Sequence, residues 1–215
     1  MAKEAGLIVA PWIRKAYKGL VRHADTAFQT FAKRHKALRC GPRCTECCHA
    51  IFGLFPLEAV LIHEAYQALN QDIKKKVQIR ALEALDALRF LNNLSAISGE
   101  ELLQRIPRIK IRCPFLGDDE LCAIYSKRPL TCRVYGIPLL LRGKVRRCAG
   151  SVQDEEHSVA LDMDDVHKKL YELSSAFLED NLIFDREKPR LLLSVSYAIL
   201  KPYDVLMDHS AIRGL

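Results

Sequence analysis

The stretch CGPRCTECC (residues 40–48) holds four of the eight cysteines of this 215-residue chain. Two cysteines separated by two residues, such as Cys44 and Cys47, can turn both sulfurs towards one metal, and this spacing recurs in zinc and iron–sulfur sites. Cys40 lies one loop turn earlier and can reach the same ion or cluster. Adjacent side chains diverge along a backbone, so we expect Cys48 to serve a second site, another face of a multi-iron cluster, or a different role.

A second group of cysteines lies far along the chain and is openly spaced. Eight, nine and fifteen residues separate its members, which are Cys113, Cys122, Cys132 and Cys148. Such sulfurs become neighbours only if the fold brings loops together around a metal, which would then hold irregular backbone in place. Free cysteine is also among the most buried residue types, so ordinary buried thiols are the alternative. We predict that all eight cysteines line one metal centre or a close pair of centres.

Composition favours a soluble, cytoplasmic protein in which thiols stay reduced. Hydrophobic residues make up 49% of the chain and charged residues 27%, as in ordinary globular proteins. No apolar run reaches the ~18–20 residues needed to cross a bilayer. The N-terminus lacks a proper apolar core and cleavage site, so we expect no signal peptide. Cytosolic thiols are kept reduced, and eight cysteines there indicate metal rather than disulfides.

Positive charge is concentrated in the two blocks that carry the cysteines. Residues 1–50 have ten basic and three acidic residues, and residues 101–150 have eleven and four, which gives each block a net charge of +7. Four thiolates around Zn²⁺ leave a net charge of −2, so nearby arginines could offset charge or donate hydrogen bonds to sulfur. The alternative is a set of solvated faces. The flanking arginines are Arg39, Arg43, Arg128, Arg133, Arg146 and Arg147. Of these, we expect Arg128 and Arg133 to bind the cofactor.

Apolar periodicity predicts a mainly helical fold. We expect a single domain over residues 1–215, with a loop-rich cysteine core at about 40–148. The predicted helices cover residues 11–39, 56–69, a segment from about 72, and 162–182. On the third of these helices we expect Ile73, Val77, Leu82, Leu85, Leu88 and Leu91 to face inward, and on the fourth Val166, Leu170, Leu173, Phe177 and Leu182.

Shorter elements are expected between and after these helices. Ser98-Gly99-Glu100-Glu101 resembles the cap of a short helix that ends before Pro107. IKIRCPFL (residues 109–116) is strand-like, and residues 137–147 form a hairpin that turns at Arg142-Gly143. Between them, residues 126–135 favour a short helix capped by Ser126. RLLLSVSYAIL (residues 190–200) fits either a buried helix or a strand.

The flanking residues of the cysteines carry a family resemblance. The quoted motifs are the doublet-ended cluster, Cys113-Pro114-Phe115-Leu116, Cys122-x-Ile124-Tyr125, Arg128-Pro129 and Cys132-Arg133-x-Tyr135. This pattern resembles the YkgJ-type cysteine-cluster family, a zinc- or iron-chelating domain named for a CxxCxxCC motif, over about residues 40–148. The resemblance implies that all eight cysteines belong to the metal-binding pattern, and it favours an iron–sulfur cluster over Zn²⁺. The chain departs from the family name, with C-x3-C-x2-C-C at residues 40–48.

Other metal assignments are weaker. An all-cysteine zinc site would be closed, tetrahedral and structural. An iron–sulfur centre would use four ligands and leave others spare or hold a second cluster. The spacing of Cys40, Cys44 and Cys47 equals that of radical SAM enzymes, but no repeated strand–helix pattern builds their barrel. His49 follows the doublet and could replace a cysteine, although the cysteines already saturate a site.

Three functions compete at this point. The first is a metal-cluster protein for redox chemistry, electron transfer or metal assembly, with a redox protein as a possible partner. The second is a zinc-stapled basic module for nucleic acid or an acidic partner, which the charge favours but which lacks an aromatic-interleaved or recognition-helix pattern. The third, weaker possibility is an S-adenosylmethionine-dependent enzyme, because flagellin lysine N-methylases resemble this cysteine pattern. No catalytic residue stands out.

Overall fold

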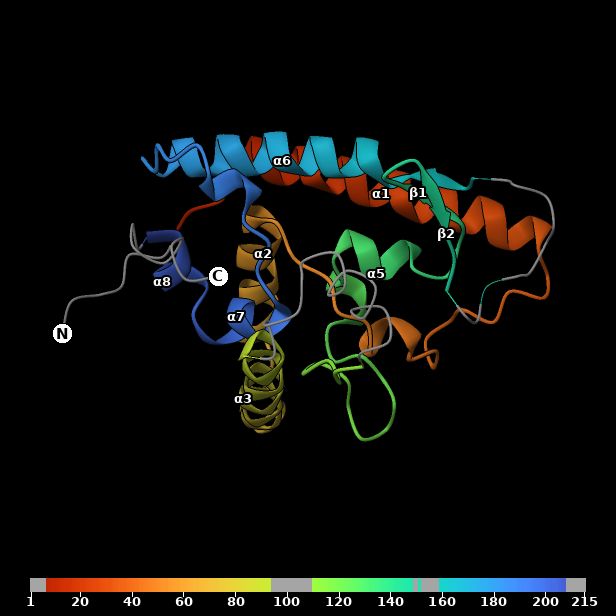
Figure 1. The fold of residues 1–215 in the computed structure, drawn as a ribbon, viewed down its shortest axis with the longest axis horizontal. Helices are drawn as coiled ribbons and strands as arrows, with labels where there is room; N and C mark the ends of the chain where they lie inside the picture. The colour runs from red at the N-terminus through yellow and green to blue at the C-terminus, as the bar shows by residue number, and fades with distance from the viewer. Residues whose placement is uncertain (1–6, 94–109, 149–150, 152–158, 208–215) are drawn as a thin grey trace.

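The computed structural model describes residues 7–93, 110–148, 151 and 159–207, and this part of the chain is mainly helical (Figure 1). Its α-helices are α1 (Pro11–Arg34), α2 (Pro56–Gln67), α3 (Gln71–Asn93), α5 (Leu130–Val134), α6 (Met163–Asp180), α7 (Val195–Leu200) and α8 (Pro202–Met207). The 3-10 turns are η1 (Glu46–Cys48), η3 (Tyr125–Lys127) and η4 (Lys188–Arg190), and the strands are β1 (Leu139–Leu141), β2 (Lys144–Arg146) and β3 (Leu161–Asp162). The predicted mainly α fold with a small hairpin is confirmed.

Two clusters of buried residues share the long helices α1 and α6, which lie side by side (Figure 1). The N-terminal half of α1 and the C-terminal half of α6 pack with α2 and α7, so Ile13 and Phe177 belong to one cluster. The other halves pack with α5, where Ala24 and Leu170 meet Leu130. Cys40 lies against Gly136, just after α5, whereas Cys113 and Cys122 pack against the first cluster.

Helix α1 begins at Pro11, as predicted, but it ends at Arg34 rather than near Arg39. The chain turns early at His35, whose ring stacks on Phe31 with the centroids 4.0 Å apart. Leu38 then packs against the second buried cluster. Burial of Leu38 thus ends the helix before Gly41-Pro42 can do so.

Helices α2 and α6 follow the predicted boundaries closely, while the inward faces of α3 and α6 differ in part. Helix α3 buries a narrow stripe that includes Val77, Ala81 and Leu85, whereas Ile73 and Leu82 are 38% and 50% exposed. A helix that packs along one side needs only such a stripe.

The C-terminal end of α6 also differs from the prediction. Leu182, expected to face inward, is 78% exposed and has a positive φ of 61°. The chain has left the helix by that point, and the following Ile183 is buried in its place. The ambiguous segment 190–200 is part extended and part helical, because Leu193 bridges Leu54 before α7 starts.

The predicted hairpin is confirmed, with β1 and β2 antiparallel and Leu141 opposite Lys144. Arg142 and Gly143 both have positive φ, 52° and 68°, which is the backbone of a tight two-residue hairpin turn. The sheet gains a third strand that the sequence did not predict, β3, parallel to β1.

Two local predictions around the second cysteine group are wrong, and one lies beyond the structure. The described part of IKIRCPFL contains no strand and only one bridge, Leu116 with Cys122. Its backbone pairs instead with the first cysteine segment. Ser126 does not cap a helix, because α5 begins after Pro129 without a side-chain cap of its own. The helix expected before Pro107 falls within 94–109, outside the described residues.

The N-terminus of α5 is held by a buried carboxylate from another helix. Glu58, on α2, is 2% exposed, and its Oε1 accepts hydrogen bonds from the Leu130 backbone N–H at 2.8 Å and the Tyr17 hydroxyl at 2.9 Å. One oxygen therefore joins α1, α2 and α5. Burial raises the pKa of Glu58, and burial together with this carboxylate raises the pKa of Tyr17 well above its usual range, so Tyr17 stays a donor.

We predict that Glu58→Leu destabilises the protein by about 2–6 kcal/mol, because it leaves two buried donors without an acceptor at about 1–3 kcal/mol each. Glu58→Gln should cost far less, since its amide oxygen can accept both bonds. Urea denaturation of both variants, with Tyr17→Phe alongside, measures the difference. Equal losses of unfolding free energy in Glu58→Leu and Glu58→Gln would contradict the role of the Oε1 atom as acceptor.

The pH dependence gives a second check on Glu58. Its folded pKa is raised, so this group's contribution to stability is present below the unfolded pKa of about 4.3 and is lost as the pH rises through the folded pKa. Glu58→Gln should lack that decline. A pH profile of the unfolding free energy that is unchanged in Glu58→Gln would show that the carboxylate is not buried in this way.

Candidate metal centre

The first cysteine segment turns back against the chain that follows α5. Cys40 lies so close to Gly136 that a Cβ on the glycine would sit 2.5 Å from the Cys40 Cβ and 2.6 Å from its Sγ. The Cys44 backbone N–H then donates to the Gly41 carbonyl at 2.9 Å, which closes the local turn. Gly136 therefore sets how closely the first cysteine can approach the segment that carries Cys132.

The Cys47–Cys48 doublet corrects one sequence prediction. The two residues lie in η1, and their sulfurs are 4.0 Å apart instead of diverging. Neighbouring side chains point to opposite faces in a strand, but a 3-10 turn places them only about a third of a turn apart. Sulfurs around tetrahedral zinc lie ~3.8 Å apart when Zn–S is near ~2.3 Å. The doublet is therefore compatible with both sulfurs facing one centre.

The segment before Cys122 is attached to the doublet through backbone hydrogen bonds. The Cys113 N–H donates to the Cys48 carbonyl at 2.6 Å, and the Ile111 N–H donates to the His49 carbonyl at 3.3 Å. Leu116 and Cys122 then pair across a tight loop. These bonds bring Cys113 and Cys122 to the first cysteine group, as the sequence required.

Cys132 and Cys148 reach the same region from regular elements. Cys132 lies on α5, so Glu58 and the Leu130 N–H fix the helix that presents it. Cys148 follows β2 and is 8% exposed, like Cys48. The six other cysteines are partly exposed, and none of the eight is fully exposed to solvent.

Electrostatic interactions join the thiols into one network centred on Cys47. Hydrogen bonds from the thiols of Cys132 and Cys48 lower the pKa of Cys47 to about 3 despite its burial. Burial, and then the neighbouring thiol charges, raises the pKa of Cys40 to about 12, and burial raises that of Cys113 to about 12.

The remaining shifts follow the same pattern. Cys48 and Cys132 donate hydrogen bonds to the Cys47 thiolate, which favours the protonated form of both donors. The pKa values of Cys48 and Cys132 are raised first for that reason and second by burial. Burial also raises the pKa of Cys122. The cluster therefore stabilises one thiolate and keeps its neighbours protonated.

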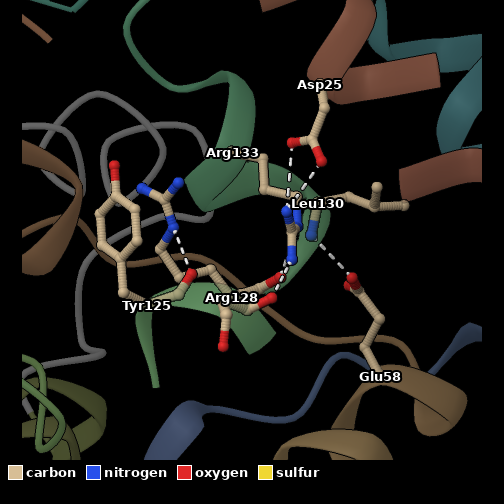
Figure 2. A network of polar contacts seen from close by, with 7 residues as sticks. Asp25, Glu58, Tyr125, Arg128, Leu130 and Arg133 are labelled. Carbon is tan, nitrogen blue, oxygen red and sulfur yellow. Dashed lines mark hydrogen bonds and ion pairs between the residues drawn. The ribbon is translucent and has the colours of Figure 1, made fainter. Parts of the chain in front are cut away.

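Arg128 and Arg133, the two arginines predicted to bind the cofactor, have different contacts (Figure 2). Arg128 stacks on the Tyr125 ring, with its guanidinium carbon 3.6 Å from the centroid, and its charge lowers the pKa of Cys40, Cys47 and Cys122 against the raising effects. Its position next to the thiols agrees with the prediction, while its role as a cofactor-binding residue stays a prediction.

Arg133 stabilises the backbone around the thiols. It donates to both carboxylate oxygens of Asp25 on α1 at 3.0 and 3.1 Å, and to the carbonyls of Arg128 at 2.9 Å and Ser126 at 2.6 Å (Figure 2). These four bonds tie α1 to the loop that carries Arg128. Arg39, Arg43, Arg146 and Arg147 lie at the surface.

Other side chains near the cysteines have local roles. His49, which we expected not to be a ligand, has its Nδ1 3.0 Å from the Thr45 carbonyl, so that nitrogen is already engaged. Glu58 and Asp25, which position the centre, were not predicted from the sequence. An acidic residue inside the apolar stretch PLEAVLI (residues 56–62) was the available signal for Glu58.

The donor chemistry of the site fits a thiophilic metal. Within the described ranges, no three His, Cys, Asp or Glu side chains are arranged as a ready set of metal ligands. The fit therefore rests on the thiols themselves: several sulfurs that repel each other when ionised are what a zinc or iron cation stabilises. No helix among the described residues is long and apolar enough to span a bilayer.

Fold and site define a helical protein with a cysteine-lined centre for zinc or iron. Residues 39–149 match the model of the CxxCxxCC family, described as "Putative zinc- or iron-chelating domain", and the chain belongs to this family. The match covers all eight cysteines and ends one residue beyond each outermost cysteine. Neither the curated proteins nor the solved structures contain a match to the chain.

We predict that Gly136→Ala displaces Cys40, because the new methyl group would overlap its Cβ and Sγ. The overpacking should cost about 1–3 kcal/mol of unfolding free energy. Gly19→Ala is the matched control, since its Cβ would meet only an Arg22 side-chain nitrogen at 3.9 Å, and in a helix it should stabilise by about 0.5–1 kcal/mol. Thermal or urea denaturation separates the two. An unchanged unfolding free energy in Gly136→Ala would contradict the close approach of Cys40 to Gly136.

Proposed function

We propose that this protein holds an iron–sulfur cluster, or Zn²⁺ as the alternative metal, through the cysteines of both groups. The interactions of Cys47 carry the proposal: its sulfur accepts hydrogen bonds from the adjacent Cys48 and from Cys132, which is 85 residues away in the chain. A centre built on Cys47 therefore draws ligands from both groups. The candidate ligands are Cys40, Cys44, Cys47, Cys48, Cys113, Cys122, Cys132 and Cys148.

An iron–sulfur cluster is preferred because the eight cysteines outnumber the ligands that one tetrahedral ion can bind. Four thiolates saturate a zinc ion, and a second zinc ion would need the other four cysteines as a separate set. The interactions of Cys47 with members of both groups argue against two separate sets. A multi-iron cluster offers several faces to such an arrangement.

The residues of this chain prepare the centre in three ways. The Cys47 sulfur is available as a thiolate before the others lose their protons. Arg128 contributes positive charge beside an anionic centre, which eases accumulation of negative charge there. Glu58 and Arg133 hold the backbone that presents Cys132 and Arg128. When bound, an iron–sulfur cluster would supply one-electron redox chemistry.

We infer a role in electron transfer or in metal assembly, with a redox protein as the partner. Six cysteines are only partly buried, so the centre lies near the surface, where a partner could approach. The surface arginines around the cysteine segments, such as Arg43 and Arg146, would favour an acidic partner surface.

Protein purified without air should be brown, with broad visible absorption that bleaches on reduction. We predict that Cys44→Ser and Cys132→Ser each lose most of the iron and the colour, because serine does not replace a thiolate ligand. His49→Ala is the matched control and should keep both. Metal analysis by mass spectrometry together with the visible spectrum measures the outcome.

Two results would count against this proposal in different ways. Colourless protein with stoichiometric zinc would end the iron–sulfur version and leave the cysteine ligands in place. Unchanged metal content in both Cys44→Ser and Cys132→Ser would reject the ligand set itself.

Metal binding should release protons, because most of the thiols have raised pKa values and metal binds the thiolate. For Zn²⁺ bound by four of these cysteines at pH 7.5, we predict about three protons released when the Cys47 thiolate is a ligand, and about four otherwise. Apparent affinity should then rise about a thousandfold per pH unit below pH 8. Calorimetry in buffers of different ionisation enthalpy counts the protons, and release of fewer than two would contradict the raised pKa values.

A further inference from the structure

A pocket of about 370 Å³ is lined by residues of α1, α2 and the η3 loop. This volume falls within the range of small-molecule sites, about 300–1,000 Å³. Its lining combines basic side chains with apolar side chains of α1 and α2. None of the eight cysteines lines it, whereas Arg128 and Arg133, the two arginines beside the cysteine centre, line its edge.

The wall of this pocket has a strong excess of positive charge. Five of the lining residues are basic and one, Glu64, is acidic. Glu64 already forms an ion pair with Arg14, whose two terminal nitrogens lie 2.6 and 2.8 Å from the carboxylate oxygens of Glu64. In the part of the chain that the structure describes, no carboxylate lies within ion-pairing distance of Lys18, Lys127 or Arg128. The pocket therefore carries cations without internal counterions.

Apolar side chains supply the rest of the pocket. Val21 on α1 and Leu61, Ile62 and Ala65 on α2 line it. Ile62 is fully packed in the first buried cluster, which makes this wall rigid. The Arg14–Glu64 pair links the same two helices. The apolar wall is thus in place before any ligand arrives.

We propose that this pocket binds a small amphipathic organic anion, a carboxylate attached to an aromatic or branched aliphatic body. The carboxylate would meet Lys18, Lys127 and the terminal nitrogens of Arg128, and the apolar body would pack on Val21, Leu61 and Ala65. Charge-assisted hydrogen bonds and apolar burial then act on the two ends of the same molecule. A free inorganic anion would use only the first of these, and a neutral apolar molecule only the second.

Equilibrium dialysis of the full chain, with its metal retained, against radiolabelled phenylacetate tests the proposal. We expect saturable binding at one site per chain. Acetate, which lacks the apolar body, and phenylacetamide, which lacks the charge, should compete at least about tenfold more weakly than unlabelled phenylacetate, a difference of about 1.4 kcal/mol. Failure of phenylacetate to bind, or equal competition by acetate or inorganic phosphate, would overturn the proposed ligand class.

Variants locate the site. Lys18→Gln combined with Lys127→Gln removes two exposed charges and should weaken phenylacetate binding at least about tenfold. Ala65→Phe should fill the apolar side and abolish binding. The matched control combines Lys15→Gln with Lys33→Gln. It lowers the net charge of the protein by the same amount, at two positions of α1 outside the pocket, and should leave binding unchanged. Equal losses in both double variants would mean that net charge alone attracts the probe, which would also overturn the site.

Circular dichroism and metal content of each variant separate loss of the pocket from loss of the fold. The exposed lysine variants should retain both, so their result decides the proposal even if Ala65→Phe fails to fold. The outcome is independent of the proposed metal function, because phenylacetate binding can be present or absent whichever metal the cysteines hold.

Discussion

A buried carboxylate accepts two hydrogen bonds through a single oxygen, and the position of the cysteine centre depends on it. The Oε1 atom of Glu58 receives the hydroxyl of Tyr17 and the backbone N–H of Leu130, so three helices meet at that oxygen. Helix α5 has five residues and cannot be stable alone, because isolated helices shorter than about 12 residues are marginal in water. Contacts with α1 and this carboxylate hold it, and Cys132 is thereby fixed relative to the long helices.

The second constraint is mutual repulsion among the thiols once they ionise. In a partly buried cluster, each thiolate raises the pKa of its neighbours, as Cys40 shows with respect to Cys44, Cys47 and Cys148. A fold that gathers these sulfurs gains little from their packing and loses stability when they ionise. The arrangement becomes favourable when a cation takes the place of the protons. A chelating family explains why a chain would bring distant cysteines together at all.

The sequence predicted the elements that depend on local patterns and failed where tertiary contacts decide. Helix starts at Pro11 and Pro56 and the turn at Arg142-Gly143 follow from local chemistry and were confirmed. The expected strand near Cys113 was wrong, because that backbone bonds to the carbonyls of Cys48 and His49 rather than to a neighbouring strand. The expected cap of α5 was wrong for the same kind of reason: the acceptor, Glu58, is 72 residues away. The spacing predicted that Cys44 and Cys47 act together, but only the fold could show that the thiol of Cys132 lowers the pKa of Cys47.

The positive charge of the two cysteine blocks also acquires a structural explanation. Arg133 is bound by Asp25 and two carbonyls, and Arg112 donates to the carbonyls of Leu116 and Gly117 at 3.2 and 2.8 Å. Guanidinium groups engaged in this way hold irregular backbone that carries no regular hydrogen-bond ladder of its own. The charge of Arg128 acts on the thiols, and the same side chain also lines the pocket beside α1 and α2. Part of the basic charge therefore supports the cysteine loops, which weakens the inference from net charge to nucleic acid. Lys18 and Lys127, which line the pocket beside α1 and α2, remain available to a ligand.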